Sequence, residues 1–153
     1  ETKVHNHGHV ILESSMGFSR MQLFAAKHSD VGLVSATTNV AGNPEQFRRP
    51  GDAPRYLNAN TPGNSFPTVA FVCVFIPRST INLVGLLDER FDPGMWEDND
   101  YCRRLQLCGL RIAIHDGCYV DHGSLRSTFR GDPRAGAKLE KGRAIYLDKW
   151  GSF

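Results

Sequence analysis

The sequence predicts an α/β domain with a mixed, mainly parallel sheet flanked by helices, and two observations predict it. In residues 17–28 apolar side chains recur at spacings of three and four, which indicates one face of a helix, and the apolar residues 31–35 follow directly as a buried strand. Residues 68–76 are apolar on both alternating faces, which is typical of a strand covered on both sides and indicates the centre of the core. With 153 residues, the chain is expected to form one domain over residues 1–153.

Composition excludes several classes of partner. The 18 Lys and Arg against 16 Asp and Glu give a net charge of +2 without basic blocks, so we expect no nucleic acid partner. The longest apolar run, residues 69–76, is far shorter than the ~20 residues of a bilayer span, so no membrane span is expected. No basic stretch followed by an apolar core opens the sequence, and its four cysteines form no C-x-x-C pair. We therefore expect reduced thiols and a cytoplasmic protein.

Two segments in the first half lack a regular pattern. His5, His7 and His9 alternate ahead of a short apolar run, which places their imidazoles on one side of an extended strand. They suit either a metal site or an exposed N-terminal strand, and we favour the strand because no carboxylate or cysteine lies nearby at ligand spacing. Residues 36–67 are rich in Asn, Pro, Gly and Thr, so we expect a long loop within the domain, either mobile over a site or a solvated insertion.

The second half of the chain follows from local signals. Pro77 ends the apolar strand, and residues 78–84 are expected to form a two-turn helix that stops at Gly85. The remaining expected elements are a loop or short extended segment over residues 86–94, a helix from residue 96 to 108, short strands over 110–114 and 118–120 around a turn at 116–117, and a helix over 137–150.

The helix expected at residue 96 begins with an acidic cluster. Glu97, Asp98 and Asp100 fall within four residues, directly after the bulky Trp96. Such crowding raises the proton affinity of at least one carboxylate. A carboxylate with a pKa lifted toward the working pH can act as a general base. The cluster also suits simple helix capping, because acidic residues complement the positive end of a helix dipole.

His122 is the second candidate for chemistry. It follows an apolar strand and begins a Gly/Ser turn, and ligands collect at strand ends in open α/β sheets. A histidine in this place is either a ligand or an ordinary hydrogen-bonded residue.

Five segments, in the correct order and spacing, resemble the C-terminal, acceptor-binding half of a family 2 glycosyltransferase with the GT-A fold. The resemblance covers roughly residues 30–151. The matching segments are Val31–Ser35 with Thr38 and Asn39; Phe75–Arg78 leading to Val84–Phe91; Trp96–Tyr101 with Arg103, Arg104, Leu105 and Gly109; Val120–Ser124 with Ser127 and Thr128; and Lys149–Gly151.

The resemblance implies inverting transfer of a sugar from a nucleotide-sugar donor to a hydroxyl of a carbohydrate or other acceptor. Asp98 occupies the position of the general base that deprotonates the acceptor. Glu97 and Asp100 would hold acceptor hydroxyls or orient the base, and Trp96 would stack on a sugar face. Arg78 belongs to the substrate-binding residues of the same interpretation.

The resemblance also implies a divalent cation, Mn²⁺ or Mg²⁺, with His122 as its C-terminal protein ligand, which would neutralise the leaving nucleoside diphosphate. The family's nucleotide-binding half, ending in an Asp-x-Asp metal motif, would precede residue 17. Residues 13–15 stand roughly where that motif would fall, but they have a single carboxylate, on Glu13. We therefore expect this half to be largely absent, and the chain to be a piece of a longer enzyme or a small relative.

Two other functions fit the same residues. One is a non-catalytic carbohydrate- or partner-binding module that keeps the scaffold, and the other is a metal-dependent hydrolase built from the N-terminal histidines and the acidic cluster. The hydrolase requires those groups to converge within a few ångströms, whereas the transferase requires Asp98 and His122 to face one cleft. Because an incomplete sheet exposes edge strands, we also expect a homo-oligomer.

Overall fold

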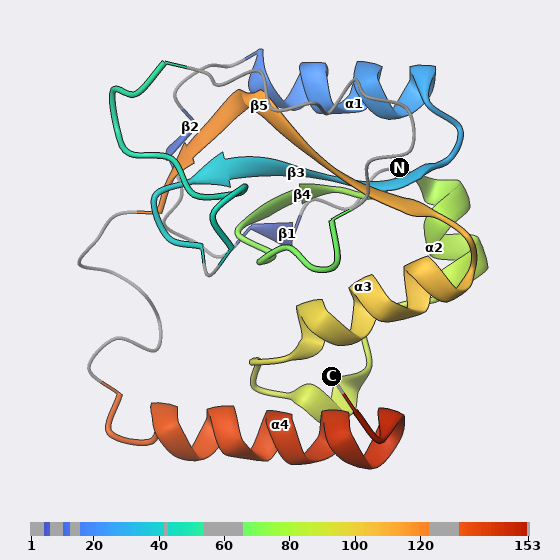
Figure 1. Ribbon diagram of the computed structural model, residues 1–153, viewed down its shortest axis with the longest axis vertical. Helices are drawn as coiled ribbons and strands as arrows, with labels where there is room; N and C mark the ends of the chain where they lie inside the picture. Colours follow the sequence, from blue (N-terminus) through green and yellow to red (C-terminus); the bar gives the residue numbers. More distant parts are fainter. Residues whose placement is uncertain are drawn as a thin grey trace.

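The computed structural model describes residues 5–6, 11–12, 16–41, 43–53, 66–122 and 132–152. Its elements form layers around one sheet, as Figure 1 shows. Helix α1 (Gly17–Lys27) covers one face of the sheet, α3 (Glu97–Leu107) lies on the other, and α4 (Ala135–Trp150) lies beyond α3. The predicted α/β class is therefore confirmed.

The sheet is mixed and has the strand order β1-β4-β3-β5-β2. Its strands are β1 (His5–Asn6), β2 (Ile11–Leu12), β3 (Val31–Thr38), β4 (Cys73–Phe75) and β5 (Arg111–Asp121). The parallel pairing of β3 with β5 is the longest, whereas β1 with β4, β3 with β4 and β2 with β5 are antiparallel. The expected mainly parallel character thus holds for the longest pairing and not for the number of strand pairs.

Strand β4 is shorter than the strand predicted over residues 68–76, and the central strand is β3. Val69, Phe71 and Val72 are buried as expected and Ala70 is partly buried, but the side chain of Gln46 takes the place of a strand partner there. Its Oε1 accepts from the backbone N–H of Ala70 and its Nε2 donates to the Ala70 carbonyl, both at 2.8 Å. The expected loop over residues 36–67 likewise starts later, because residues 36–38 belong to β3.

Strand β5 is one continuous strand, where the sequence predicted two strands and a turn. Residues 116–118 form a bulge in its pairing with β3. The carbonyls of this bulge accept hydrogen bonds from Arg20, Arg48 and the hydroxyl of Thr37, at 3.0–3.3 Å. These distant donors satisfy the backbone carbonyls that are not paired with β3, so β5 continues through the bulge as one strand.

The helices lie close to their predicted ranges. Helix α2 (Arg78–Val84) ends at Gly85 as expected, and a 3₁₀ turn, η1 (Glu89–Phe91), lies within the predicted loop. Within the described residues no helix has the length and apolar character needed to cross a bilayer. All four cysteines are free thiols.

Two apolar clusters hold the layers together. Met21 and Phe24 of α1 pack with Val34 and Val120 on one face of the sheet. Tyr101, Cys102 and Leu105 of α3 pack on the other face, together with Leu33, Val74, Ile112 and Ile114. The second cluster fixes the start of α3, and therefore the acidic cluster, against the sheet.

Candidate active site at the start of helix α3

The turn that leads into α3 has an unusual backbone. Met95 and Trp96 have φ values of 78° and 76°, in the left-handed region that residues with side chains rarely adopt. Helix α4 covers this turn: Gly142 lies against the Met95 carbonyl, and the ring of Trp96 packs on that of Tyr146 with centroids 5.2 Å apart. Strained backbone of this kind persists only where its surroundings impose it, and it is concentrated at functional sites.

Asp98 lies in the first turn of α3 and is partly buried. Its Oδ1 accepts from the backbone N–H of Asn99 at 2.8 Å and from Asn99 Nδ2 at 3.1 Å. Burial raises the pKa of Asp98 to about 6, with the neighbouring charge of Glu97 as the second cause, while hydrogen bonds from backbone N–H groups, including that of Phe71, act in the opposite direction. The prediction that one carboxylate of the cluster binds its proton more tightly is confirmed.

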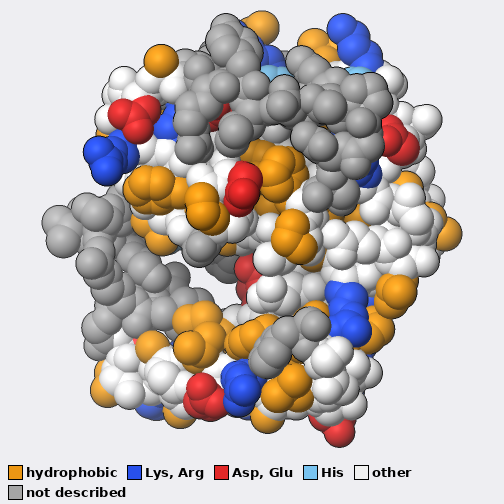
Figure 2. Space-filling view, viewed as in Figure 1, with side chains coloured by type: hydrophobic (Ala, Val, Ile, Leu, Met, Phe, Trp, Pro, Cys, Tyr) orange, Lys and Arg blue, Asp and Glu red, His pale blue; other side chains and the backbone are white. Residues whose placement is uncertain are grey.

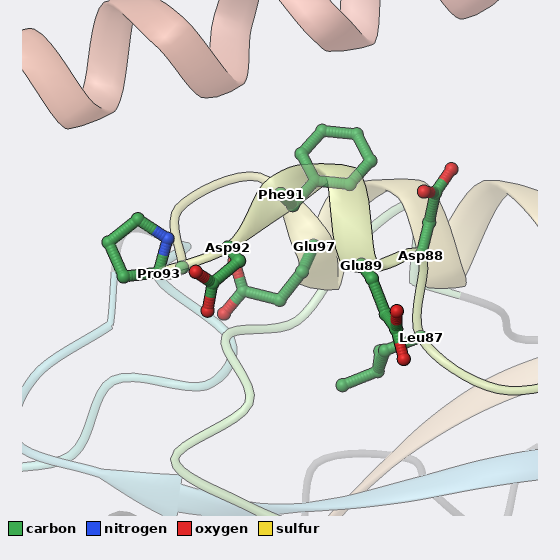
Figure 3. A pocket seen from close by; sticks show the side chains of 8 residues that line it. Leu87, Asp88, Glu89, Phe91, Asp92, Pro93 and Glu97 are labelled. Atoms are coloured by element: carbon green, nitrogen blue, oxygen red, sulfur yellow. The ribbon is translucent and has the colours of Figure 1, made fainter.

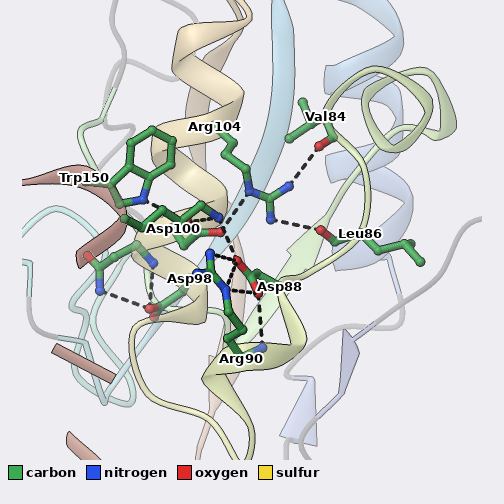
Figure 4. Close-up of polar contacts among 10 residues, drawn as sticks. Val84, Leu86, Asp88, Arg90, Asp98, Asp100, Arg104 and Trp150 are labelled. Atoms are coloured by element: carbon green, nitrogen blue, oxygen red, sulfur yellow. Dashed lines mark hydrogen bonds and ion pairs between the residues drawn. The ribbon is translucent and has the colours of Figure 1, made fainter. Parts of the chain in front are cut away.

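Asp100 has the opposite surroundings, although it lies only two residues further on. It is fully buried, and its Oδ1 accepts from Trp150 Nε1 at 2.9 Å and from Lys149 Nζ at 2.8 Å. Its Oδ2 accepts from Arg104 Nε at 2.9 Å. Figure 4 shows Asp100, Arg104 and Trp150 pointing toward one another.

The contacts of Asp100 belong to a larger ion-pair network, which comprises Asp88, Asp100, Arg104, Lys149 and Trp150. Lys149 Nζ also binds Asp88 at 2.8 Å, and the guanidinium of Arg104 donates to the carbonyls of residues 84 and 86. Hydrogen bonds from Arg90 and then Lys149 hold the pKa of Asp88 well below its usual range. The network ties α3, α4 and the segment before η1 together, so Asp100 positions the acidic cluster rather than facing an open site.

Glu97 lines a cavity of about 600 Å³ next to this network (Figure 3). Its Oε2 is buried and has no hydrogen-bond partner among the residues that the structure describes. The other lining residues are Leu87, Asp88, Glu89, Phe91, Asp92, Pro93 and Gly94. The wall thus combines carboxylates with apolar surface, and its volume is within the range of small-molecule sites.

His122 follows the end of β5, as predicted. Its backbone N–H donates to Asn39 Oδ1 at 3.0 Å, and Asn39 Nδ2 donates to Asp121 Oδ1 at 2.8 Å. The Nδ1 atom of His122 is buried without a hydrogen-bond partner in the described part of the chain. Over the same residues, no three His, Cys, Asp or Glu side chains form a group that could hold a metal ion.

A polar track connects Asp98 with His122. It comprises Asn99, Thr68, Asn43, Gln46, Thr38 and Asn39, and each member is hydrogen-bonded to the next. Its two ends are the hydrogen bond from Asn99 to Asp98 and the one from His122 to Asn39. Figure 2 shows the molecule hollowed between the sheet and α4, with an acidic side chain at the edge of the hollow.

The track is what the sequence analysis missed, although its Asn- and Thr-rich composition was visible. Residues 36–47 carried the signal, but composition alone indicated only a loop. Because Gln46 is fully buried and bonded to Ser35 and Ala70, this part of the expected loop is fixed to the sheet. Residues 54–65 lie outside the described residues.

Asp98, Trp96 and Arg78 are not among the residues that line the cavity. Arg78 is exposed in the first turn of α2, and the Trp96 ring packs on α4. His5 is in β1, with β4 and β3 between it and β5, while His7 and His9 fall outside the described residues. The strand order therefore separates His5 from His122.

Comparisons of the chain with protein-family models, with curated proteins and with solved structures give no match. The fold and the site geometry are therefore the basis for a function.

Proposed function

We propose that this chain is a glycosyltransferase-like domain that resembles the acceptor half of an inverting, family 2 enzyme of GT-A fold, with Asp98 as the general base. The observation that carries the proposal is the placement of Asp98: a first-turn carboxylate, held by Asn99, with a pKa of about 6. Such a group is largely ionised at neutral pH and still basic enough to take a proton from a hydroxyl.

In the proposed reaction an acceptor hydroxyl loses its proton to Asp98 as its oxygen attacks the anomeric carbon of the donor sugar. The bond from that carbon to the nucleoside diphosphate breaks in the same step, so no covalent sugar–enzyme intermediate forms. Asp98 and the displaced diphosphate lie on opposite sides of the anomeric carbon, which gives inversion. The chain supplies position and a proton acceptor.

The remaining residues of the site support this role through their surroundings. The Oε2 atom of Glu97 is buried without a hydrogen-bond partner among the described residues, so it suits a hydroxyl of an acceptor sugar in the cavity of about 600 Å³. Asp100 orients α3 through Arg104 and Lys149. Contact of Trp96 or Arg78 with substrate remains part of the proposal.

Donor binding is proposed through His122 as one ligand of Mn²⁺ or Mg²⁺. A bound cation would neutralise the charge of the leaving diphosphate. We expect UDP or GDP with Mn²⁺ to stabilise the chain, by ~2.7 kcal/mol at one hundred times the dissociation constant. His122→Ala should weaken this metal-dependent stabilisation, and equal donor affinity in that variant with Mn²⁺ present would rule out the assignment.

The direct test is a screen of nucleotide sugars with added Mn²⁺, in which transfer to carbohydrate acceptors and hydrolysis of the donor are both measured. We expect one donor class to be consumed and the product to have the inverted anomeric configuration. A retained configuration contradicts the single displacement. Acceptor binding in the cavity without consumption of any donor favours the non-catalytic carbohydrate-binding module instead.

A further inference from the structure

A second cavity, of about 280 Å³, lies between α2 and α3. Its wall is largely apolar and includes Phe71, Ile76, Ile81, Leu86, Leu87 and Tyr101. Glu89 is the charged residue of this wall, and it is exposed. An apolar cavity of ~150 Å³ is large enough to bind benzene, so this cavity has room for a ring with substituents.

Tyr101 adds a polar group to this apolar wall. The residue is 2% exposed, and its hydroxyl is buried without a hydrogen-bond partner among the described residues. Its ring is held by an edge-to-face contact with Phe71, with centroids 5.9 Å apart, and by the Arg104 guanidinium 4.9 Å from its centroid. A buried hydroxyl without a partner costs free energy, and an oxygen atom of a group bound in the cavity would accept its hydrogen bond.

The cavity is adjacent to the candidate base. Phe71 lines the cavity, and its backbone N–H donates a hydrogen bond to Asp98. Asp98 and Tyr101 are three residues apart on α3, so their side chains lie on the same side of the helix. Leu87 and Glu89 line both this cavity and the larger one that contains Glu97, so the two cavities share a wall.

We propose that the smaller cavity is a binding subsite for an apolar group of ring size that carries one oxygen, which it binds through apolar contact and the Tyr101 hydroxyl. The substrate assignment rests on the proposed function: the apolar group is then the aromatic aglycone of the acceptor. Leu86, which is 69% exposed, extends the apolar wall to the surface, where such a group enters.

The first test compares phenol and benzene as probes, because they share a ring and differ by one hydroxyl. Binding is followed by NMR of labelled Ile and Leu methyl groups, of which Ile76, Ile81 and Leu87 report on the cavity. We expect both probes to shift these methyls and phenol to bind more tightly. Tyr101→Phe keeps the ring, so it should weaken the binding of phenol about two- to tenfold and leave the binding of benzene unchanged.

The second test fills the cavity. Ile81→Phe places a larger side chain on its α2 wall and should abolish binding of both probes, whereas Leu83→Phe, on an exposed position of the same helix, should change neither. If Ile81→Phe fails to fold, the affinities of Tyr101→Phe for phenol and benzene still test the subsite. No methyl shift with either probe overturns the proposal, as does a phenol affinity that Tyr101→Phe leaves unchanged.

Transfer assays separate this proposal from the proposed function. Phenyl β-D-glucoside and methyl β-D-glucoside are compared as acceptors, and the phenyl compound is expected to have the lower KM, a preference that Ile81→Phe removes. Transfer with no phenyl preference, together with no phenol binding, overturns the subsite and leaves the transferase intact. Phenol binding in the cavity without transfer to any acceptor overturns the proposed transferase and leaves the subsite intact.

Discussion

Asp98 and Asp100 both lie in the first turn of α3, but their carboxylates have opposite surroundings. Asp100 is fully buried and bonded to Arg104, Lys149 and Trp150, so its charge is compensated. Asp98 faces Asn99 and the neighbouring charge of Glu97, and burial raises its pKa to about 6. The difference shows that two carboxylates in one acidic cluster can have opposite surroundings, one with its charge compensated by cations and one with a raised pKa.

The largest expected effect is on the rate of sugar transfer, and it tests Asp98 as the general base. Asp98→Asn removes the proton acceptor at constant shape, so kcat should fall by about 10²–10⁴ while the fold is kept, since general-base catalysis contributes that much. Initial rates with the donor found in the screen measure it, and circular dichroism checks the fold. Asp52→Asn, in an exposed stretch of the loop, is the control. Unchanged turnover in Asp98→Asn would refute the base assignment.

The next largest effect is on the free energy of unfolding, and it tests the structural role of Asp100 in the ion-pair network. Asp100→Asn leaves the cations of Arg104 and Lys149 without their buried counter-charge, which should lower the free energy of unfolding by about 3 kcal/mol. Urea unfolding measures the change. In Glu140→Gln the lost partner is exposed and 3.9 Å from Arg143, so the change should stay below about 1 kcal/mol. Equal changes in the two variants would mean that the network does not hold the site.

The third prediction concerns pH and isolates Asp98. Its pKa is raised from 3.8 to about 6 in the folded chain, so between pH 4 and 6 the folded state keeps a proton that the unfolded state has released. Asp98 therefore lowers the free energy of unfolding as pH rises through this window, and the full penalty is present above pH 6. Asp98→Asn lacks this penalty.

The measurement is the difference in free energy of unfolding between Asp98→Asn and the unaltered chain at pH 4 and pH 7. The variant should gain about 2 kcal/mol relative to the unaltered chain over that range, because one pKa unit corresponds to about 1.4 kcal/mol and the side chain is partly exposed. Transfer should rise with pH around pH 6 in the unaltered chain. A pH-independent difference in stability would place the pKa of Asp98 at its ordinary value.

The sequence predicted the helices well because their signals are local. The spacing of Met21, Phe24 and their neighbours defined α1 without reference to the rest of the chain, and Gly85 marked the end of α2. The strands depended on distant partners. The side chain of Gln46 replaces part of the ladder beside β4, and distant donors such as Arg20 keep β5 continuous through its bulge.

The candidate site, too, could be predicted only where its signals are local in the sequence. Crowding of Glu97 beside Asp98 indicated a raised pKa, but burial is the larger cause and depends on the tertiary packing of α3. The role of Asp100 was hidden because Trp150 lies 50 residues further along the chain. His122 was placed correctly at the end of its strand, yet the track that joins it to Asp98 passes through residues that looked like an ordinary loop.

The smallest effect concerns how α4 holds the turn before α3. A Cβ on Gly142 would meet the Met95 carbonyl and the Trp96 ring, so Gly142→Ala should push α4 away and lower the free energy of unfolding by about 1–2 kcal/mol. Gly136→Ala is the matched control, because it lies in the same helix with nothing within 4 Å and should raise stability by about 0.5–1 kcal/mol through helix propensity. Thermal unfolding of both variants measures the contrast. Stabilisation by both substitutions would show that α4 does not press on the turn, and the left-handed backbone of Trp96 would then need another cause.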